Sequence, residues 1–237
     1  MQTPTDELYS ELQEAYIFLN DNLFNGILPG CLFTLQRKQN TFGYYSSSRF
    51  LRRDARRKSD EISLNPVYFA FRSIEQTLST LLHEMVHQWQ THFGKPSRSG
   101  YHNREWSEKM ESLGLMPSNT GEVGGNRVGQ KMTHYIIEGG AFALTCETLL
   151  QMGGMISWVD IVAKRVPLSV EFLLGRSQPD EVIKTAVVTD QQQNTKLKIK
   201  YTCPICATNI WGKPGLLVGC LNCNIPFEKN SKGTQRS

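Results

Sequence analysis

The sequence has no apolar run long enough to span a membrane, and its first residues lack the basic start and apolar stretch of a secretory signal peptide. It also has no internal repeat. Neither sign of charge dominates, because 26 basic and 22 acidic residues leave a net charge of +4, which identifies no polyanionic partner by itself. These absences argue against the membrane, secreted and repeat classes. We therefore expect a cytoplasmic protein without a membrane partner, either free or associated with the nucleoid.

The chain has 237 residues, enough to bury the core of one catalytic domain and to carry a small appendage. Without an export signal, the paired spacing of four of the six cysteines favours metal binding over disulfides. We place the catalytic domain at residues 1–190, the appendage at 196–228 and a polar tail at 229–237. The polar stretch 175–195 is typical of a linker.

The first 65 residues have the pattern of a helix followed by a small sheet. Thr3 and Pro4 are a typical helix start, and Gly26 is a typical helix end. Strands are predicted at residues 31–36, 41–47 and 60–65. The loop between the last two strands is strongly basic, with Arg49, Arg52, Arg53, Arg56, Arg57 and Lys58. A solvated surface and a surface for a polyanion are equally good interpretations of this loop.

Apolar residues recur at helical spacing between residues 74 and 92, and this predicted helix contains the sequence HEMVH. Residues four apart differ by about 40° around a helix, so His83 and His87 project from one face toward a single ion. Glu84 lies beside them and could accept a proton from a water molecule whose pKa a zinc ion has lowered to about 7. The structural alternative is a helix with two ordinary histidines.

A catalytic zinc site needs a third protein ligand, and three residues are candidates. His102 follows the turn-prone segment 94–100 and opens a second predicted helix, so the chain can reverse and return its imidazole to the ion. Glu105, one turn later, could supply a carboxylate instead. His92 lies about 140° around the helix from His87 and is interpreted as a surface residue. We favour His102.

These residues resemble those of the SprT-like metalloproteases, a family with bacterial members and eukaryotic relatives called Spartan. The likeness depends on HEMVHQW and, after a short loop, GYHNREW, and it covers residues 5–115 and 196–228. It implies a zincin-type fold, zinc held by His83, His87 and His102, and Glu84 as the catalytic acid and base. Residues 116–195 match no motif of the family.

A side chain that could stabilise a developing oxyanion is expected near such a site. His134 and Tyr135, in the segment THYIIEGG, are the candidates. Ordinary core or surface positions are the favoured interpretation of both residues.

Near the C-terminus, Cys203 and Cys206 form one Cys-x-x-Cys pair and Cys220 and Cys223 form another, with thirteen residues between the pairs. This spacing is typical of a four-cysteine zinc site. Four thiolates fill a tetrahedral ion, so this second zinc should be structural, whereas the zinc at the histidines should be catalytic. A segment this small cannot bury enough apolar surface, so the metal should supply much of its folding free energy.

Alternation in the strand that leads into the cysteine segment places lysines on one face. Together with two residues inside the segment, they form a candidate nucleic-acid-binding surface: Lys196, Lys198, Lys200, Trp211 and Lys213. Lysines can follow phosphates and a tryptophan can stack on an unpaired base, which favours single-stranded DNA as the partner. Packing of the tryptophan onto the catalytic domain is an equally good interpretation. The Spartan resemblance also implies recruitment to DNA.

The sequence therefore predicts an α+β fold, with a zincin-like metalloprotease domain of a small sheet and the HExxH helix, followed by a four-cysteine zinc ribbon. The first functional hypothesis is a zinc-dependent endopeptidase of the SprT-like type, with DNA-associated or DNA-crosslinked proteins as substrates by resemblance. The second is a non-enzymatic nucleic-acid-binding protein in which both zinc sites are structural. Glu84 favours the first hypothesis, because a structural site has no need of a general base.

Overall fold

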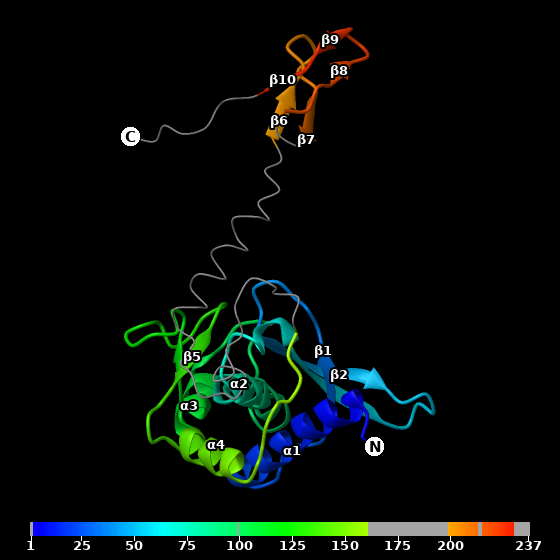
Figure 1. Ribbon diagram of the computed structural model, residues 1–237. Helices are drawn as coiled ribbons and strands as arrows, with labels where there is room; N and C mark the ends of the chain where they lie inside the picture. Colours follow the sequence, from blue (N-terminus) through cyan, green and yellow to red (C-terminus); the bar gives the residue numbers. More distant parts are fainter. Residues whose placement is uncertain (1, 99, 161–198, 213–214, 230–237) are drawn as a thin grey trace. The chain divides into compact units, whose positions relative to one another are not determined.

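The computed structural model describes residues 2–98, 100–160, 199–212 and 215–229 (Figure 1). The chain divides into two compact units, Met1–Ile183 and Lys184–Ser237. The linker expected at 175–195 and the domain boundary at 190 lie outside the described residues, as does the expected tail after its first residue. No helix in the described ranges is long and apolar enough to cross a membrane.

The first unit opens with the predicted helix, α1 (Pro4–Phe24). The Thr3 hydroxyl accepts a hydrogen bond from the backbone N–H of Asp6, and Asn25 ends the helix with a positive φ of 56°. The buried face of α1 includes Leu12 and Leu19, which are fully inaccessible to solvent. The helix is therefore fixed by its caps and by one apolar face.

Three strands follow and form a mixed sheet in the order β1 (Leu32–Leu35), β3 (Lys58–Leu64), β2 (Gly43–Leu51). Strand β1 is parallel to β3, and β2 is antiparallel to it. Strand β2 continues past the predicted end at residue 47, because a register shift and a positive φ of 49° at Ser48 form a bulge. The basic loop is therefore the tip of a long hairpin, and β2 is an edge strand.

Helix α2 (Ile74–Phe93) lies in the middle of this unit and follows a short 3-10 turn at Pro66–Tyr68 (Figure 1). It packs against β2 and β3 and against helices α1, α3 (Arg104–Ser112) and α4 (Ala141–Gln151). Five apolar residues on its inner face are at most 2% exposed: Leu78, Leu81, Leu82, Met85 and Val86. Burial of each such side chain stabilises the fold by about 1.5–3 kcal/mol, which fixes how α2 is rotated.

Between α3 and α4 lies an element that the sequence pattern did not identify. Strands β4 (Leu115–Ser118) and β5 (Thr133–Ile136) pair antiparallel, and the loop between them contains most of the predicted loop 117–131. His102 and Gly129 form an isolated bridge, with two backbone hydrogen bonds of 2.8 and 3.1 Å. The bridge brings this loop to the start of α3.

The described residues of the second unit form five short strands. Strands β6 (Ile199–Thr202), β7 (Asn209–Gly212) and β10 (Glu228–Lys229) form one sheet in the order β10-β6-β7. Strands β8 (Gly219–Cys220) and β9 (Ile225–Pro226) form a second pair. Among the described residues of this unit, only Tyr201, Cys203 and Cys220 are buried.

Candidate metal centre

The helix that carries the HExxH sequence has a strong start. Ser73 caps the N-terminus of α2: its hydroxyl accepts a hydrogen bond from the backbone of Gln76, whose side chain bonds back to the Ser73 N–H. The apolar face described above turns His83, Glu84 and His87 toward α3 and β2. His83 and Glu84 are only 7% and 5% exposed.

His102, immediately before α3, completes a group of three histidines. One ligand atom from each of His83, His87 and His102 lies within 4.8 Å of the others. The Nε2 atoms of His87 and His102 are 3.1 Å apart. Two nitrogens bound to a tetrahedral zinc ion at about 2.0–2.1 Å would be separated by about 3.3 Å, so the group has the geometry of such a site.

The orientation of His102 is set by the β4–β5 loop. Its Nδ1 lies 3.2 Å from the carbonyl oxygen of Gly129, which can only accept a hydrogen bond. Nδ1 must therefore carry the proton, and Nε2 presents a lone pair to the other histidines. The side chain of Asn103 caps α3 at the Trp106 N–H, 3.0 Å away, and so fixes the turn that positions His102.

Trp106 forms the floor of the group. The tryptophan is completely buried, and its ring centroid lies 4.9, 5.3 and 4.4 Å from those of His83, His87 and His102. Its indole N–H has no hydrogen-bond partner within the described part of the chain. The large apolar ring restricts the rotation of all three imidazoles and excludes water from that side.

Burial controls the protonation of these histidines. Desolvation lowers the pKa of His87 to about 3, and the proximity of His102 adds to this effect. The pKa of His83 lies well below its usual value. Burial is the main cause, and electrostatic effects add to it, in decreasing order from His87, His134, His102 and Arg72. Burial also lowers the pKa of His102, against the hydrogen bond to Gly129. All three imidazoles are therefore neutral near pH 7, as metal ligands must be.

Glu84, which follows His83 on α2, is buried and meets the edge strand β2. Burial raises its pKa to about 8, and a hydrogen bond from the backbone N–H of Tyr45 on β2 opposes that rise. The same tyrosine donates its hydroxyl to Asp60, 3.0 Å away. The carboxyl group of Glu84 is thus held between the HExxH helix and the edge of the sheet.

The other two candidates for a third ligand have different partners. The Glu105 carboxylate accepts hydrogen bonds of 2.7 Å from Gln90 and from the backbone N–H of Lys95. Glu105 therefore ties the end of α2 to the following turn. His92 is exposed, as predicted for a surface residue, and its Nε2 lies 2.7 Å from Asp60. Asp60 also accepts the Ser48 N–H, and this network anchors the bulge of β2.

His134 on β5 lies behind His83. The Nδ1 atoms of the two rings are 3.2 Å apart, and His134 Nε2 lies 2.9 Å from the Ser79 hydroxyl. Both ring nitrogens of His134 are thus occupied within the protein. The alternation of a strand turns Tyr135 to the opposite face of β5, away from His134. Ser79 and Gly129 were not predicted as partners of the histidines. Ser79 lies one helical turn before His83, so helical spacing could have identified it.

The sequence profile of one protein family matches residues 12–131, which include the three histidines, Glu84 and the Gly129 loop. The chain belongs to the SprT-like family. It is also similar to an uncharacterized protein encoded in the mucB 3' region of Salmonella typhimurium, with 52% identity over 59 residues, 25% of this chain and 80% of the relative. No solved structure matches the chain. Membership of the SprT-like family indicates a function of the zinc metalloprotease type.

The four cysteines of the SprT-like chain form a second group that could hold an ion. None of them is in a disulfide, and the Sγ atoms of Cys206 and Cys220 lie 3.7 Å apart. Zinc–sulfur bonds of about 2.3 Å in a tetrahedron place the sulfurs about 3.8 Å apart. Ala207 and Asn224, each four residues after the first cysteine of a pair, have φ values of 57° and 50°. The two cysteine turns therefore have similar backbone geometry.

The candidate nucleic-acid surface is described only in part. Lys196, Lys198 and Lys213 lie outside the described residues. Lys200 and Trp211 are direct partners across β6 and β7, so their side chains share one face. Both are exposed, Trp211 at 61%. An exposed tryptophan beside a lysine is the arrangement expected for base stacking next to a phosphate.

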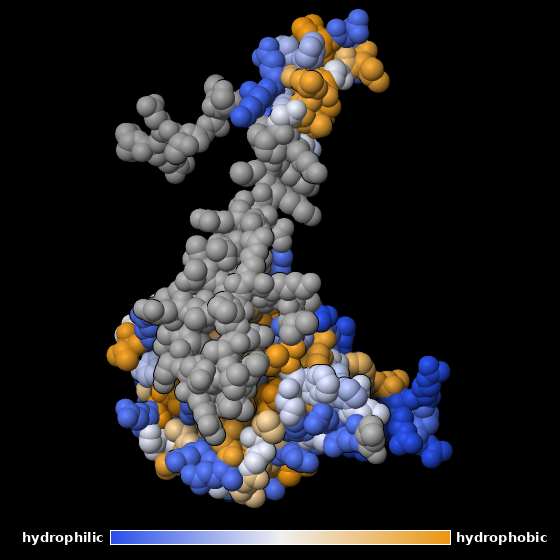
Figure 2. Space-filling view, in the orientation of Figure 1, coloured by the Kyte–Doolittle hydropathy of each residue, from blue (hydrophilic) through white to orange (hydrophobic). Residues whose placement is uncertain are grey.

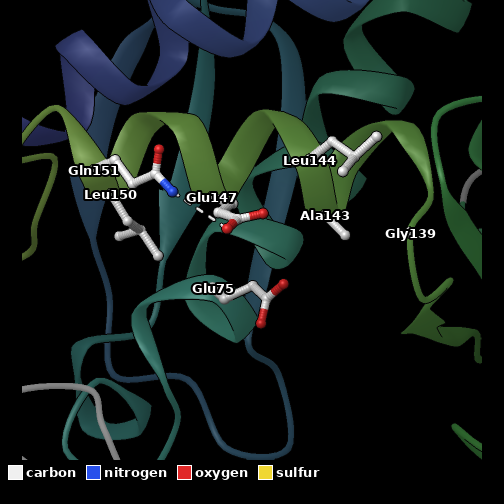
Figure 3. Close-up of a pocket in the computed structure, with 7 residues that line it drawn as sticks. All are labelled: Glu75, Gly139, Ala143, Leu144, Glu147, Leu150 and Gln151. Atoms are coloured by element: carbon white, nitrogen blue, oxygen red, sulfur yellow. Dashed lines mark hydrogen bonds between the residues drawn. The ribbon is translucent and has the colours of Figure 1, made fainter.

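A shallow depression lies away from the histidines, along α4 and the start of α2 (Figure 3). Its lining is mainly apolar, with Leu144 and Leu150 on α4. The carboxyl groups of Glu75 and Glu147 point into the same space, and burial raises the pKa of Glu75. The depression contains none of the residues predicted from the sequence.

Proposed function

We propose that this SprT-like protein is a zinc-dependent endopeptidase with a zincin-like catalytic domain. The observation that carries the proposal is a group of three convergent, neutral imidazoles together with Glu84, which follows His83 in the HExxH sequence and is also buried. Two of them come from α2, and the third comes from the turn before α3. A structural metal site would not require a titratable carboxyl group at this position.

His83, His87 and His102 would hold the ion, and the four cysteines would hold a second, structural one. A zinc ion at the histidines would polarise the scissile carbonyl and lower the pKa of a water molecule. Glu84 would accept the proton of this water and deliver it to the leaving amine nitrogen. Glu84 acts as a base only as a carboxylate. The positive charge of a zinc ion at the histidines would therefore have to lower the pKa of Glu84 from about 8.

The free edge of β2 is an argument that the substrate is a peptide. An exposed edge strand can pair with an extended chain through backbone hydrogen bonds. Among the described strands, β2 pairs with β3 alone, and the Tyr45 N–H on its other side points at Glu84. An extended peptide along this edge would therefore place a peptide bond close to Glu84.

The test is the variant Glu84→Gln, assayed for cleavage of unstructured protein substrates with and without DNA. We expect kcat/KM to fall by about 10²–10⁴-fold while zinc content per chain stays at the parent value, because the base is lost and the ligands remain. Glu108→Gln, an exposed position on α3, is the matched control and should keep full activity. Equal cleavage by the parent and Glu84→Gln would contradict the proposal.

We also propose that DNA-associated proteins are the substrates and that the chain itself contacts DNA. Residues 49–58 contain six basic residues and one acidic residue, an excess of five charges where the whole chain has only +4. The arginines and the lysine of this hairpin tip are exposed, and Figure 2 shows the hydrophilic group at the tip. Lys200 and Trp211 provide a second surface, suited to unpaired bases.

Two observations would separate this proposal from the non-enzymatic alternative. Trp211→Ala should weaken binding to single-stranded DNA, with about 1–3 kcal/mol lost per stacked base, and leave cleavage of free protein substrates unchanged. A parent protein that binds DNA but cleaves no protein, even when the protein is attached to DNA, would instead identify a binding protein whose two metal sites are structural.

A further inference from the structure

We propose that His134 is a positioning residue of the metal centre, which holds His83 in the one tautomer that can bind a metal ion. This inference rests on the metal site of the proposed function but concerns metal binding alone. Metal-binding histidines generally donate their second ring N–H to an acceptor, and this outer contact sets the orientation of the ring. For His102 that acceptor is the carbonyl of Gly129, 3.2 Å away. Within the described residues, no carbonyl accepts from His83; its Nδ1 faces His134.

The contacts run from His83 to His134 and from there to Ser79, and the direction of each hydrogen bond follows from the Ser79 end. The Ser79 hydroxyl donates to the backbone carbonyl of Gln76 at 2.9 Å, so its oxygen is left to accept. His134 Nε2, 2.9 Å from that oxygen, must then carry a proton. A neutral imidazole protonated at Nε2 has a bare Nδ1, which can only accept.

His83 must therefore donate from Nδ1 to His134 across 3.2 Å. A neutral His83 with its proton on Nδ1 has a bare Nε2, the atom left to bind the ion. The opposite tautomer of His134 would require Ser79 to donate to it and to give up the Gln76 carbonyl. A chain of hydrogen bonds from Gln76 and Ser79 on α2 through His134 on β5 thus determines the tautomer of His83.

Burial keeps water from replacing the hydrogen-bond partners in this arrangement. Ser79 is 1% exposed and His83 is 7% exposed, so water has little access to replace His134 as the acceptor. Trp106 packs against the His83 ring with centroids 4.9 Å apart and contributes no acceptor of its own. His134 is therefore the group within the described residues that can receive the Nδ1 proton.

The experiment compares zinc affinity of the full-length parent, His134→Ala and His134→Asn by competition with a chelator. Loading of the histidine site is followed through the ring nitrogen NMR signals of His102, which do not report on the cysteine site. The asparagine oxygen can take the place of Nδ1 as an acceptor. We expect about 10–100-fold weaker zinc binding in His134→Ala and affinity within about threefold of the parent in His134→Asn. Unchanged affinity in His134→Ala, or an equal loss in both variants, would overturn the proposal.

Two further measurements separate positioning from a general structural role. In the zinc-free parent, the ring nitrogen shifts of His83 should show Nδ1 protonated and Nε2 bare; the reverse would overturn the proposal. His92→Gln removes a histidine of the same helix that contacts Asp60, and it should bind zinc like the parent. If His134→Ala fails to fold, His134→Asn and the His83 tautomer still decide the question. A parent that binds zinc but cleaves nothing would refute the peptidase function and leave this inference intact.

Discussion

At the scale of single residues, burial of the histidine group makes stability depend on pH. His87 has a pKa of about 3 in the folded protein and about 6.5 in an unfolded chain. Between these values the unfolded state binds a proton that the folded state does not. Stability from this group is therefore complete above about pH 6.5 and is lost as the pH falls toward 3. His83, His102 and His134 have pKa values shifted in the same direction.

We expect the metal-free protein to lose up to about 2 kcal/mol of stability from His87 alone between pH 7 and pH 5. Urea unfolding of the chelator-treated protein at both pH values, followed by helical circular dichroism, measures the loss. The variant His87→Gln should have a shallower dependence on pH, because one of the buried imidazoles is gone. The same slope in His87→Gln and the parent would contradict this account.

At the scale of elements, the junction after α3 brings the end of β5 and the start of α4 close together. Gly114 has a φ of 89°, and its carbonyl accepts the Ile137 N–H at 2.9 Å. A Cβ at this position would lie 2.8 Å from the Phe142 N and 2.9 Å from the Ala141 N, at the start of α4. Both the backbone conformation and the close approach therefore require glycine.

The variant Gly114→Ala should accordingly lose more stability than Gly139→Ala. Gly139 also has a positive φ, 65°, but nothing lies within 4 Å of its Cβ position, so it reports the conformational cost alone, about 1–2 kcal/mol. We expect Gly114→Ala to lose at least about 1 kcal/mol more, because α4 must move. Urea midpoints of the two variants test this difference. Equal losses would mean that the junction accommodates a methyl group.

At the scale of the whole molecule, the two units should respond differently to removal of metal. The first unit has a hydrophobic core of its own around α2, whereas the described part of the second has three buried residues, two of them cysteines. The free energy that holds the second unit together should therefore come mostly from its ion. The first unit should stay folded without metal.

We expect a chelator to abolish amide hydrogen-exchange protection in β6–β10 and to leave the helical signal of the first unit largely intact. Elemental analysis should find about two zinc ions per chain before treatment. The variant Cys223→Ser should reproduce the loss of protection without a chelator, and His102→Ala should not. Simultaneous loss of both units on chelation would show that the histidine site also supports the fold.

The sequence by itself determined the features that depend on local spacing. The caps and apolar period of α1 and the apolar period of α2 predicted both helices, and the i, i+4 spacing placed His83 and His87 on one face. The two cysteine pairs needed only their own spacing to indicate a metal site. His102 was preferred because it follows a turn, and α3 does begin directly after it.

Only the tertiary structure decided which distant groups complete the centre. Gly129 and His134 come from a segment without a regular period, so no local pattern could link them to His102 and His83. The partnership of His92 with Asp60 escaped prediction for the same reason, since helical geometry gives the direction of a side chain and not what another strand brings to meet it. Local spacing fixes residues on one element, whereas contacts between elements depend on how the buried apolar faces pack together.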